Sequence, residues 1–284
     1  MRLLSLTALT MAAFAANSVL NRLALADGDA GPAAFAALRL VAGAAILSVL
    51  VLSRGSGWSA LAPKSPTGVW SLALYMLGFS FAYVTLDAGV GALILFGGVQ
   101  LTMFAGALLS GERIVAARWI GTGLALAGLA YLLWPSGAAA PGLWGALLMA
   151  AAAVGWGIYS LHGRTAFDPL GATAGNFVCA VPLGLIVFLA VPDGMSLRGA
   201  VLAILSGAVT SGLGYALWYR VLPQLAASTA ALVQLTVPVI ALAGGMAFLG
   251  EALTLRFVFA SALILGGVAI GIVAPQRRIG SSGS

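Results

Sequence analysis

The sequence has very little charge and long stretches without any. Charged residues make up 7% of its 284 residues, whereas globular domains contain about 25%. Hydrophobic residues make up 62%, and the mean hydropathy is +1.10. Several apolar runs reach the ~20 residues that a helix needs to cross a bilayer. The composition therefore excludes an ordinary soluble domain and predicts an all-α membrane protein with several spans.

Residues that carry chemistry are also scarce. One cysteine, Cys179, excludes an intramolecular disulfide and any cysteine-based metal site. The single histidine, His162, and the lack of an acid at the centre of any apolar run leave no nucleophile–base pair or metal cluster to build. The net charge is +6, but the Lys and Arg residues are scattered singly and form no basic cluster with aromatic residues among them. We therefore expect no enzyme, no cofactor, no metal and no nucleic-acid partner.

Turn residues and charges divide the chain into ten predicted transmembrane spans. They cover residues 3–25, 33–52, 69–86, 90–109, 117–134, 142–162, 171–191, 198–219, 227–249 and 256–274. The first span imitates a secretory signal peptide, but the second half of the chain has an equivalent segment that cannot be one, so we expect it to be retained. The end of the tail, residues 280–284, resembles an appended linker.

The basic residues favour one side of the membrane. If the chain has ten spans, nine of the Lys and Arg residues fall on the side of the N-terminus and three on the opposite side, while Arg39 lies within a span. Cytoplasmic loops are enriched in Lys and Arg, so both termini are predicted to be cytoplasmic. The three on the outer side are Arg22, Arg198 and Arg256.

The chain contains an internal repeat. Gly111-Glu112 and Gly250-Glu251 are 139 residues apart, and the same offset aligns Leu124 with Leu263 and Gly128 with Gly267. The predicted units are a first five-helix repeat, 1–135, a second, 141–275, and a tail, 276–284. Five spans per unit is an odd number, so the second unit enters the membrane from the opposite side. Inverted repeats of this kind are typical of secondary transporters.

These motifs resemble a known family. The ten-helix EamA-type branch of the drug/metabolite transporter superfamily has a Gly-Glu between the fourth and fifth helices of each repeat, and a Trp-Gly before a basic residue in the first. Here Trp156-Gly157 precedes Arg164, and Phe14-Ala15 precedes Arg22 without the Trp. The resemblance implies a bacterial inner-membrane exporter that works by alternating access. Within the branch the chain looks most like exporters of amino acids, aromatic ones included; exporters of other metabolites or lipophilic drugs are the alternative.

Two aromatic stripes are candidates for the walls of a substrate cavity. Tyr75, Phe79 and Tyr83 share one helical face of the third span. Tyr215 and Trp218 share a face of the eighth, together with Tyr219. The alternative is an aromatic belt at the membrane interface, and for Tyr83 and Tyr219, near span ends, the belt is the favoured interpretation.

Polar side chains in mid-membrane need a partner or water, and so indicate a site. Asn17, Gln100, Trp156 and Tyr159 are such residues, and amides suit a zwitterionic substrate. The alternative for each is a hydrogen bond between helices.

Three charged residues complete the list of candidates. For Arg39 we favour a structural role, in which it reaches outward or pairs with an acid such as Asp27 or Asp87, over attraction of a substrate carboxylate. For Glu112 and Glu251 we expect capping of a neighbouring helix, or pairing with Arg113, Arg118 or Arg256, rather than substrate contact. Substrate-binding candidates are thus Asn17, Tyr75, Phe79, Gln100, Trp156, Tyr159, Tyr215 and Trp218.

Overall fold

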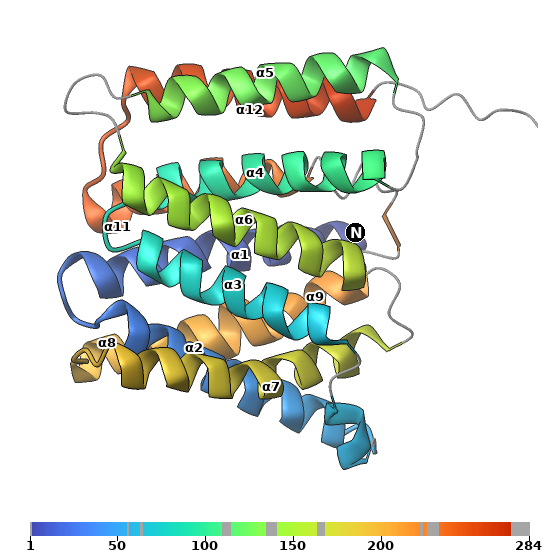
Figure 1. The fold of residues 1–284 in the computed structure, drawn as a ribbon, viewed down its shortest axis with the longest axis vertical. Helices are drawn as coiled ribbons and strands as arrows, with labels where there is room; N and C mark the ends of the chain where they lie inside the picture. The colour runs from blue at the N-terminus through green and yellow to red at the C-terminus, as the bar shows by residue number, and fades with distance from the viewer. Residues whose placement is uncertain are drawn as a thin grey trace, which may run out of the picture.

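A computed structural model gives the fold of the chain (Figure 1). It describes residues 2–55, 57–62, 65–109, 115–134, 141–163, 168–221, 224–225 and 233–273. Apart from a 3-10 helix, η1 (Trp58–Leu61), and a π-helix, η2 (Leu205–Leu213), the regular structure in these residues is α-helical. The α-helices are α1 (Arg2–Ala26), α2 (Pro32–Leu52), α3 (Pro66–Ala82), α4 (Ala88–Leu109), α5 (Ala116–Leu133), α6 (Leu143–Gly163), α7 (Pro169–Ala190), α8 (Leu197–Ile204), α9 (Gly214–Val221), α11 (Thr236–Leu249) and α12 (Leu255–Val273).

The prediction of a multi-pass helical membrane protein is confirmed. Among the described residues, seven helical segments are long and apolar enough to cross a membrane, the α8–η2–α9 segment being one of them. The predicted third span begins earlier than expected, because Pro66 starts α3 and the Ser65 hydroxyl accepts from the Thr67 N–H; it also ends earlier, at Ala82. In the predicted ninth span, α11 begins only at Thr236, and residues 226–232 lie outside the described part.

Helices at matching places in the two halves pack against each other. α5 runs along α12, α2 along α7, and α4 along α11, while α3 packs on α6 much as η2 and α9 pack on α1 (Figure 1). If each helix is replaced by the helix at the same place in the other half, the same pairs of helices are in contact. It brings the first helix of each half, α1 and α6, to the middle of the bundle (Figure 1).

Glycines allow α5 and α12 to approach closely. A Cβ atom on Gly121 would clash with the carbonyl oxygen of Gly267, and one on Gly267 would lie 2.6 Å from the carbonyl oxygen of Gly121. A Cβ on Gly128 would lie 2.9 Å from the Cβ of Leu263, and one on Gly267 would lie 2.8 Å from the Cβ of Leu124. These two contacts are related by the 139-residue offset, so the helices meet through equivalent surfaces. Such close backbone contact is how helices associate where lipid gives no hydrophobic driving force.

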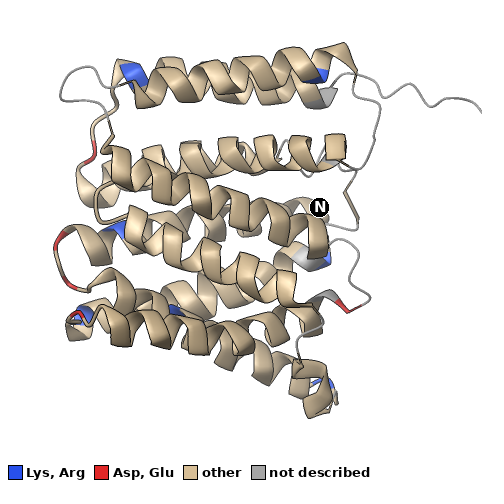
Figure 2. Cartoon of the chain, viewed as in Figure 1, with Lys and Arg blue, Asp and Glu red and all other residues tan. Residues whose placement is uncertain are grey.

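The turns at one end of the bundle are tied together by charges. The Asp193 carboxylate, in the α7–α8 loop, accepts from the N–H groups of Ala33 and Ala34 at 2.8 Å each and so caps α2. Arg198 pairs with Asp29 at 2.7 Å in the same region. Figure 2 shows most charged residues near the ends of the helices, as a membrane-spanning bundle requires.

The predicted eighth span is not a uniform helix. Its middle, η2 (Leu205–Leu213), is a π-helix between α8 and α9. A Cβ on Gly207 would collide with the Arg39 carbonyl oxygen, so η2 lies directly against α2. The wider turn directs three hydroxyl groups, those of Ser206, Thr210 and Ser211, into the bundle, where all three are buried. Such π segments often occur at functional sites.

The cap on α2 can be tested with two aspartates at the same end of the bundle. Asp193→Ala should lower the free energy of unfolding by about 1–2 kcal/mol, because two N–H groups at a helix start lose their acceptor. Asp27→Ala is the control, since Asp27 is exposed and no side-chain hydrogen bond or ion pair is found for it in the structure as described. Thermal unfolding of the purified protein in detergent measures both; equal stability of the two variants would contradict the cap.

The α5–α12 contact offers a matched pair of glycines. Gly121→Ala should destabilise the protein by about 1–3 kcal/mol, since overpacking forces two backbones apart. Gly123→Ala, on the same helix, has nothing within 4 Å of the new Cβ. It should be neutral or stabilising by up to about 1 kcal/mol, because alanine is the better helix former. The same unfolding measurement compares them, and a Gly121→Ala protein as stable as wild type would rule out the close contact.

Candidate functional site

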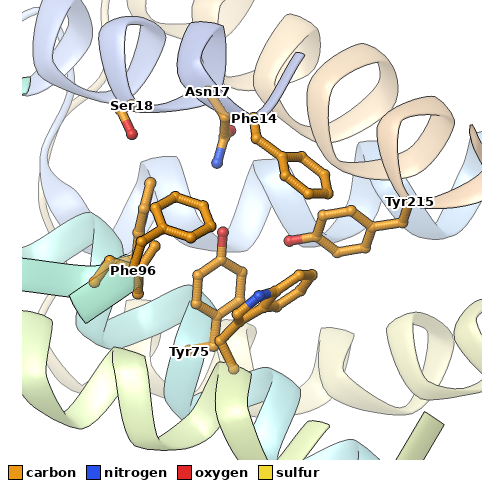
Figure 3. Close-up of a pocket in the computed structure, with 9 residues that line it drawn as sticks. Phe14, Asn17, Ser18, Tyr75, Phe96 and Tyr215 are labelled. Atoms are coloured by element: carbon orange, nitrogen blue, oxygen red, sulfur yellow. The ribbon is translucent and has the colours of Figure 1, made fainter. Parts of the chain in front are cut away.

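A narrow cavity lies in the middle of the bundle, among α1, α3, α4, α6 and α9 (Figure 3). Both halves of the chain contribute side chains to it. Most are aromatic or aliphatic, and none of those found in the described residues is acidic. The lining residues are Phe14, Asn17, Ser18, Tyr75, Phe79, Leu95, Phe96, Trp156 and Tyr215.

Trp156 is the centre of the aromatic wall. Its ring centroid lies 4.9 Å from that of Tyr75 and 4.8 Å from that of Tyr215, both at tilted angles. Phe14 meets Trp156 edge to face at 6.0 Å. Aromatic pairs prefer such tilted and edge-to-face geometries. Two positions of the proposed repeat motif, 14 and 156, therefore touch each other inside the cavity.

A buried polar network closes another side of the cavity. The Asn17 side-chain oxygen accepts from Ser206 Oγ at 2.7 Å and from Thr210 Oγ1 at 2.9 Å. Asn21 Nδ2 donates to Ser206 Oγ at 3.1 Å, and its side-chain oxygen accepts from Ser80 Oγ at 3.3 Å. The network joins α1, α3 and η2, as the helix-bonding alternative predicts. It also holds the Asn17 amide nitrogen toward the cavity (Figure 3).

Arg39 is not placed as the sequence suggested. It neither reaches outward nor pairs with Asp27 or Asp87; its side chain is 0% exposed on α2. Its Nε and Nη2 atoms each donate to Ser211 Oγ at 3.2 Å, and Nη2 also donates to the Tyr75 hydroxyl at 3.3 Å. The guanidinium carbon lies 4.9 Å from the ring centroid of Phe79. Arg39 therefore stands directly behind two cavity-lining aromatics, a position that spacing along the sequence could not reveal.

The structure brings five of the eight predicted site residues together in the lining: Asn17, Tyr75, Phe79, Trp156 and Tyr215. Tyr159 stacks on Trp156, with ring centroids 5.7 Å apart, and Trp218 packs on Phe14 at 5.9 Å, so both support the lining from behind. Gln100 is half-buried on α4 and is not among the lining residues.

Some residues were missed or misplaced by the sequence analysis. Phe14, Ser18, Leu95 and Phe96 line the cavity without having been predicted. The alignment of Phe14 with Trp156 in the repeat motif was the available signal for Phe14. The belt interpretation of Tyr83 is wrong, because this residue is fully buried and packs on Phe79 at 4.7 Å. The side chain of Tyr219 lies outside the described structure.

The second Gly-Glu pair has the structural role that was predicted. Glu251 Oε1 accepts from the Ala88 N–H at 2.6 Å, and Oε2 from the Gly89 N–H at 3.5 Å, so the carboxylate caps α4. Its arginine partner, Arg22 at 4.0 Å, is not one of the three that were predicted; Arg22 also pairs with Asp87 at 3.5 Å. The first pair, Gly111-Glu112, lies outside the described residues.

These contacts join three segments at one end of the bundle. Arg22 Nη1 donates to the carbonyl oxygens of Tyr83 and Val84, so α1, the α3–α4 turn and the α11–α12 turn are held together. Burial raises the pKa of the Glu251 carboxyl, and Asp87 adds to this, while the Ala88 N–H and Arg22 act in the opposite direction. We call Arg22, Asp87 and Glu251 the end cluster, because their contacts tie these three segments together.

The lining of the cavity has the chemistry of a site that makes non-covalent contacts with a small organic molecule. Its walls offer aromatic faces for an apolar group and a few directed polar groups, the usual composition of a ligand pocket. In the described residues there is no group of three or more His, Cys, Asp or Glu that could hold a metal ion.

Comparison with known proteins gives the context of this geometry. Residues 143–273 match the model of the EamA-like transporter family. A solved structure, described only as a crystal structure of a protein, aligns with a TM-score of 0.66 and 25% identity, covering 94% of this chain and 98% of that one.

Similar sequences extend the match over nearly the whole chain. The uncharacterized protein PA1977 of Pseudomonas aeruginosa is 48% identical over 97% of this chain and 96% of its own length. An uncharacterized transporter of Archaeoglobus fulgidus is 26% identical over 84% of this chain and 88% of its own length. YoaV of Bacillus subtilis, also an uncharacterized transporter, is 29% identical over 48% of this chain and 49% of its own. The chain belongs to the EamA-like transporter family of the drug/metabolite transporter superfamily.

Proposed function

We propose that this transporter exports amino acids, aromatic or other neutral ones, through the central cavity. The observation that carries the proposal is the cavity itself, which combines an aromatic wall around Trp156 with the inward-facing amide of Asn17. The aromatic rings suit an apolar or aromatic side chain. The amide and the neighbouring phenol groups suit the polar backbone of an amino acid, because such groups fix orientation in a mostly apolar pocket.

The movement that we propose is alternating access between two inverted repeats, residues 1–135 and 141–275. The reciprocal contacts of α5 with α12 and the pairing of α2 with α7 support a two-fold relation between them. The end cluster would hold one face closed in one state and release it in the other. In this proposal the end cluster faces outward and both termini lie in the cytoplasm of a bacterium, as the basic residues suggest.

A carrier of lipophilic drugs or other small metabolites is the alternative function. An aromatic cavity fits apolar cargo as well, but a buried cation also needs a counter-charge such as a carboxylate. The residues that line this cavity in the described structure include no carboxylate. This favours a substrate that is not a cation.

Counterflow in liposomes tests the proposed substrate. Wild-type protein should exchange labelled phenylalanine or another neutral amino acid across the vesicle membrane, and Asn17→Ala and Trp156→Ala should reduce the initial rate at least about tenfold. A loss of about 1.4 kcal/mol of binding energy is enough for that change. The physical reason is that each substitution removes a lining side chain that touches the substrate.

A second tryptophan on α6 gives the matched control. Trp144 is 71% exposed, whereas Trp156 is 4% exposed. Trp144→Ala should therefore leave counterflow unchanged. Movement of lipophilic cations or lipid without any movement of amino acids would contradict the proposal and favour the alternative.

The closed face can be probed through Glu251. Glu251→Gln removes the charge that pairs with Arg22 and weakens the cap on α4, a loss of about 1 kcal/mol. This should raise the fraction of molecules open at that face about fivefold. Ser18, which lines the cavity, serves as reporter when Ser18→Cys is introduced together with Cys179→Ala. The rate at which a membrane-impermeant thiol reagent labels this reporter from the outer side measures the opening.

The control for the labelling experiment is Asp27→Asn, an exposed acid in the α1–α2 loop. It should leave the labelling rate as it is. If Glu251→Gln also left the rate unchanged, the end cluster would not hold this face closed.

A further inference from the structure

Arg39 carries a positive charge inside the bundle, and the surrounding residues do not satisfy all of its hydrogen-bond donors. It is fully buried, and no ion pair found among the described residues includes it. Its Nη1 atom is buried and has no hydrogen-bond partner. An unpaired charge in the membrane interior is costly, and such residues in transporters commonly mark the substrate path.

The neighbours of Arg39 hold it in place without neutralising it. Ser211 and the Tyr75 hydroxyl accept hydrogen bonds from Nε and Nη2, and the rings of Tyr75 and Phe79 lie 5.5 and 4.9 Å from the guanidinium carbon. Hydroxyl oxygens and aromatic faces carry only partial charges. The charge therefore remains uncompensated, while its position and orientation are fixed.

The arrangement points toward the cavity. Tyr75 is shared by both features: its hydroxyl accepts from Arg39 Nη2, and its side chain lines the cavity, with the hydroxyl directed to the middle (Figure 3). Phe79 likewise has the guanidinium on one side and belongs to the lining. A ligand in the cavity that contacts Tyr75 would thus lie beside the guanidinium.

The other polar groups of the cavity are mainly donors. Trp156 Nε1 can only donate, and it is buried without a partner. The Asn17 oxygen is already taken by Ser206 and Thr210, so its free function is the donating amide nitrogen. Donors that converge beside a fixed cation form a site for an anion, since charge-assisted hydrogen bonds are the stronger ones.

We propose that Arg39, together with the Tyr75 hydroxyl, binds the carboxylate of the transported substrate, and that this carboxylate, rather than an ammonium group, is the group the site recognises. The inference rests on the proposed function and narrows it: the substrate class is carboxylates that carry an apolar or aromatic body. An aromatic carboxylate without an amino group is then a ligand, and the matching amine is not.

Three probes of similar size distinguish recognition of a carboxylate from recognition of an ammonium group. They are L-phenylalanine, which carries both groups, 3-phenylpropionate, which carries the carboxylate, and 2-phenylethylamine, which carries the ammonium group. Their binding to the purified full-length protein in detergent is measured by isothermal titration calorimetry. The first two should bind wild type, and the amine should not. Arg39→Gln should weaken the binding of L-phenylalanine and 3-phenylpropionate ten- to a hundredfold, as expected for loss of a charged hydrogen-bond partner. Tyr75→Phe should weaken this binding several-fold.

Two controls separate binding from folding. Arg54→Gln removes an exposed arginine one residue beyond the C-cap of the same helix, α2, and should leave binding unchanged. The melting temperature of ligand-free Arg39→Gln should equal or exceed that of wild type, because removing an uncompensated buried charge does not destabilise the fold. A purely structural arginine would give the opposite result, and Tyr75→Phe tests the site if Arg39→Gln does not fold.

The outcomes are distinct. Binding of 2-phenylethylamine as tight as that of 3-phenylpropionate, unchanged carboxylate binding by Arg39→Gln, or no carboxylate binding by wild type would each overturn the inference. Normal counterflow of phenylalanine by Arg39→Gln would overturn it while leaving amino-acid export intact. If 3-phenylpropionate bound through Arg39 but no amino acid were transported, the inference would hold and the proposed function would fail.

Discussion

Lipid offers no hydrogen bonds, so every polar group inside this bundle must be satisfied by the protein itself or by what the protein carries. The network around Asn17 meets this constraint with side chains from three segments, and the π-helical turn of η2 supplies two of its hydroxyl groups. The same turn supplies Ser211 to Arg39. The irregular part of the eighth span therefore brings hydroxyl groups to the buried polar side chains of α1 and α2.

Close packing is the second condition for this arrangement. Small residues bring α5 within backbone contact of α12. In the same way, a Cβ on Gly155 would lie 2.7 Å from the Ser71 carbonyl oxygen, which shows how closely α6 approaches α3. Aromatic side chains of α1, α3, α4, α6 and α9 fill the middle, where they line the cavity, whereas others such as Trp144 face outward. Trp156 lies one residue beyond Gly155, so the close contact and the cavity wall are built by the same turn of α6.

Charge at the ends and charge in the middle have different functions in this molecule. Glu251, Asp193 and Asp29 satisfy helix starts and basic partners at one end, where water and backbone N–H groups are available. Arg39 has no such surroundings, and the groups around it orient it without cancelling its charge. This contrast separates the charges that hold the fold together from the one that points to a ligand.

The sequence by itself determined the class of protein, the approximate helix boundaries and the candidate aromatic residues. These follow from composition and from the length of apolar runs, which are properties of each segment alone. It also indicated that Glu251 caps a neighbouring helix. The tertiary structure alone decided which residues meet: that Phe14 faces Trp156, that Tyr83 is buried and no belt residue, and that Gln100 stays out of the cavity lining. It also decided the place of Arg39, because the partners of a buried cation come from α3 and η2, and helical periodicity within α2 says nothing about which helices pack against it.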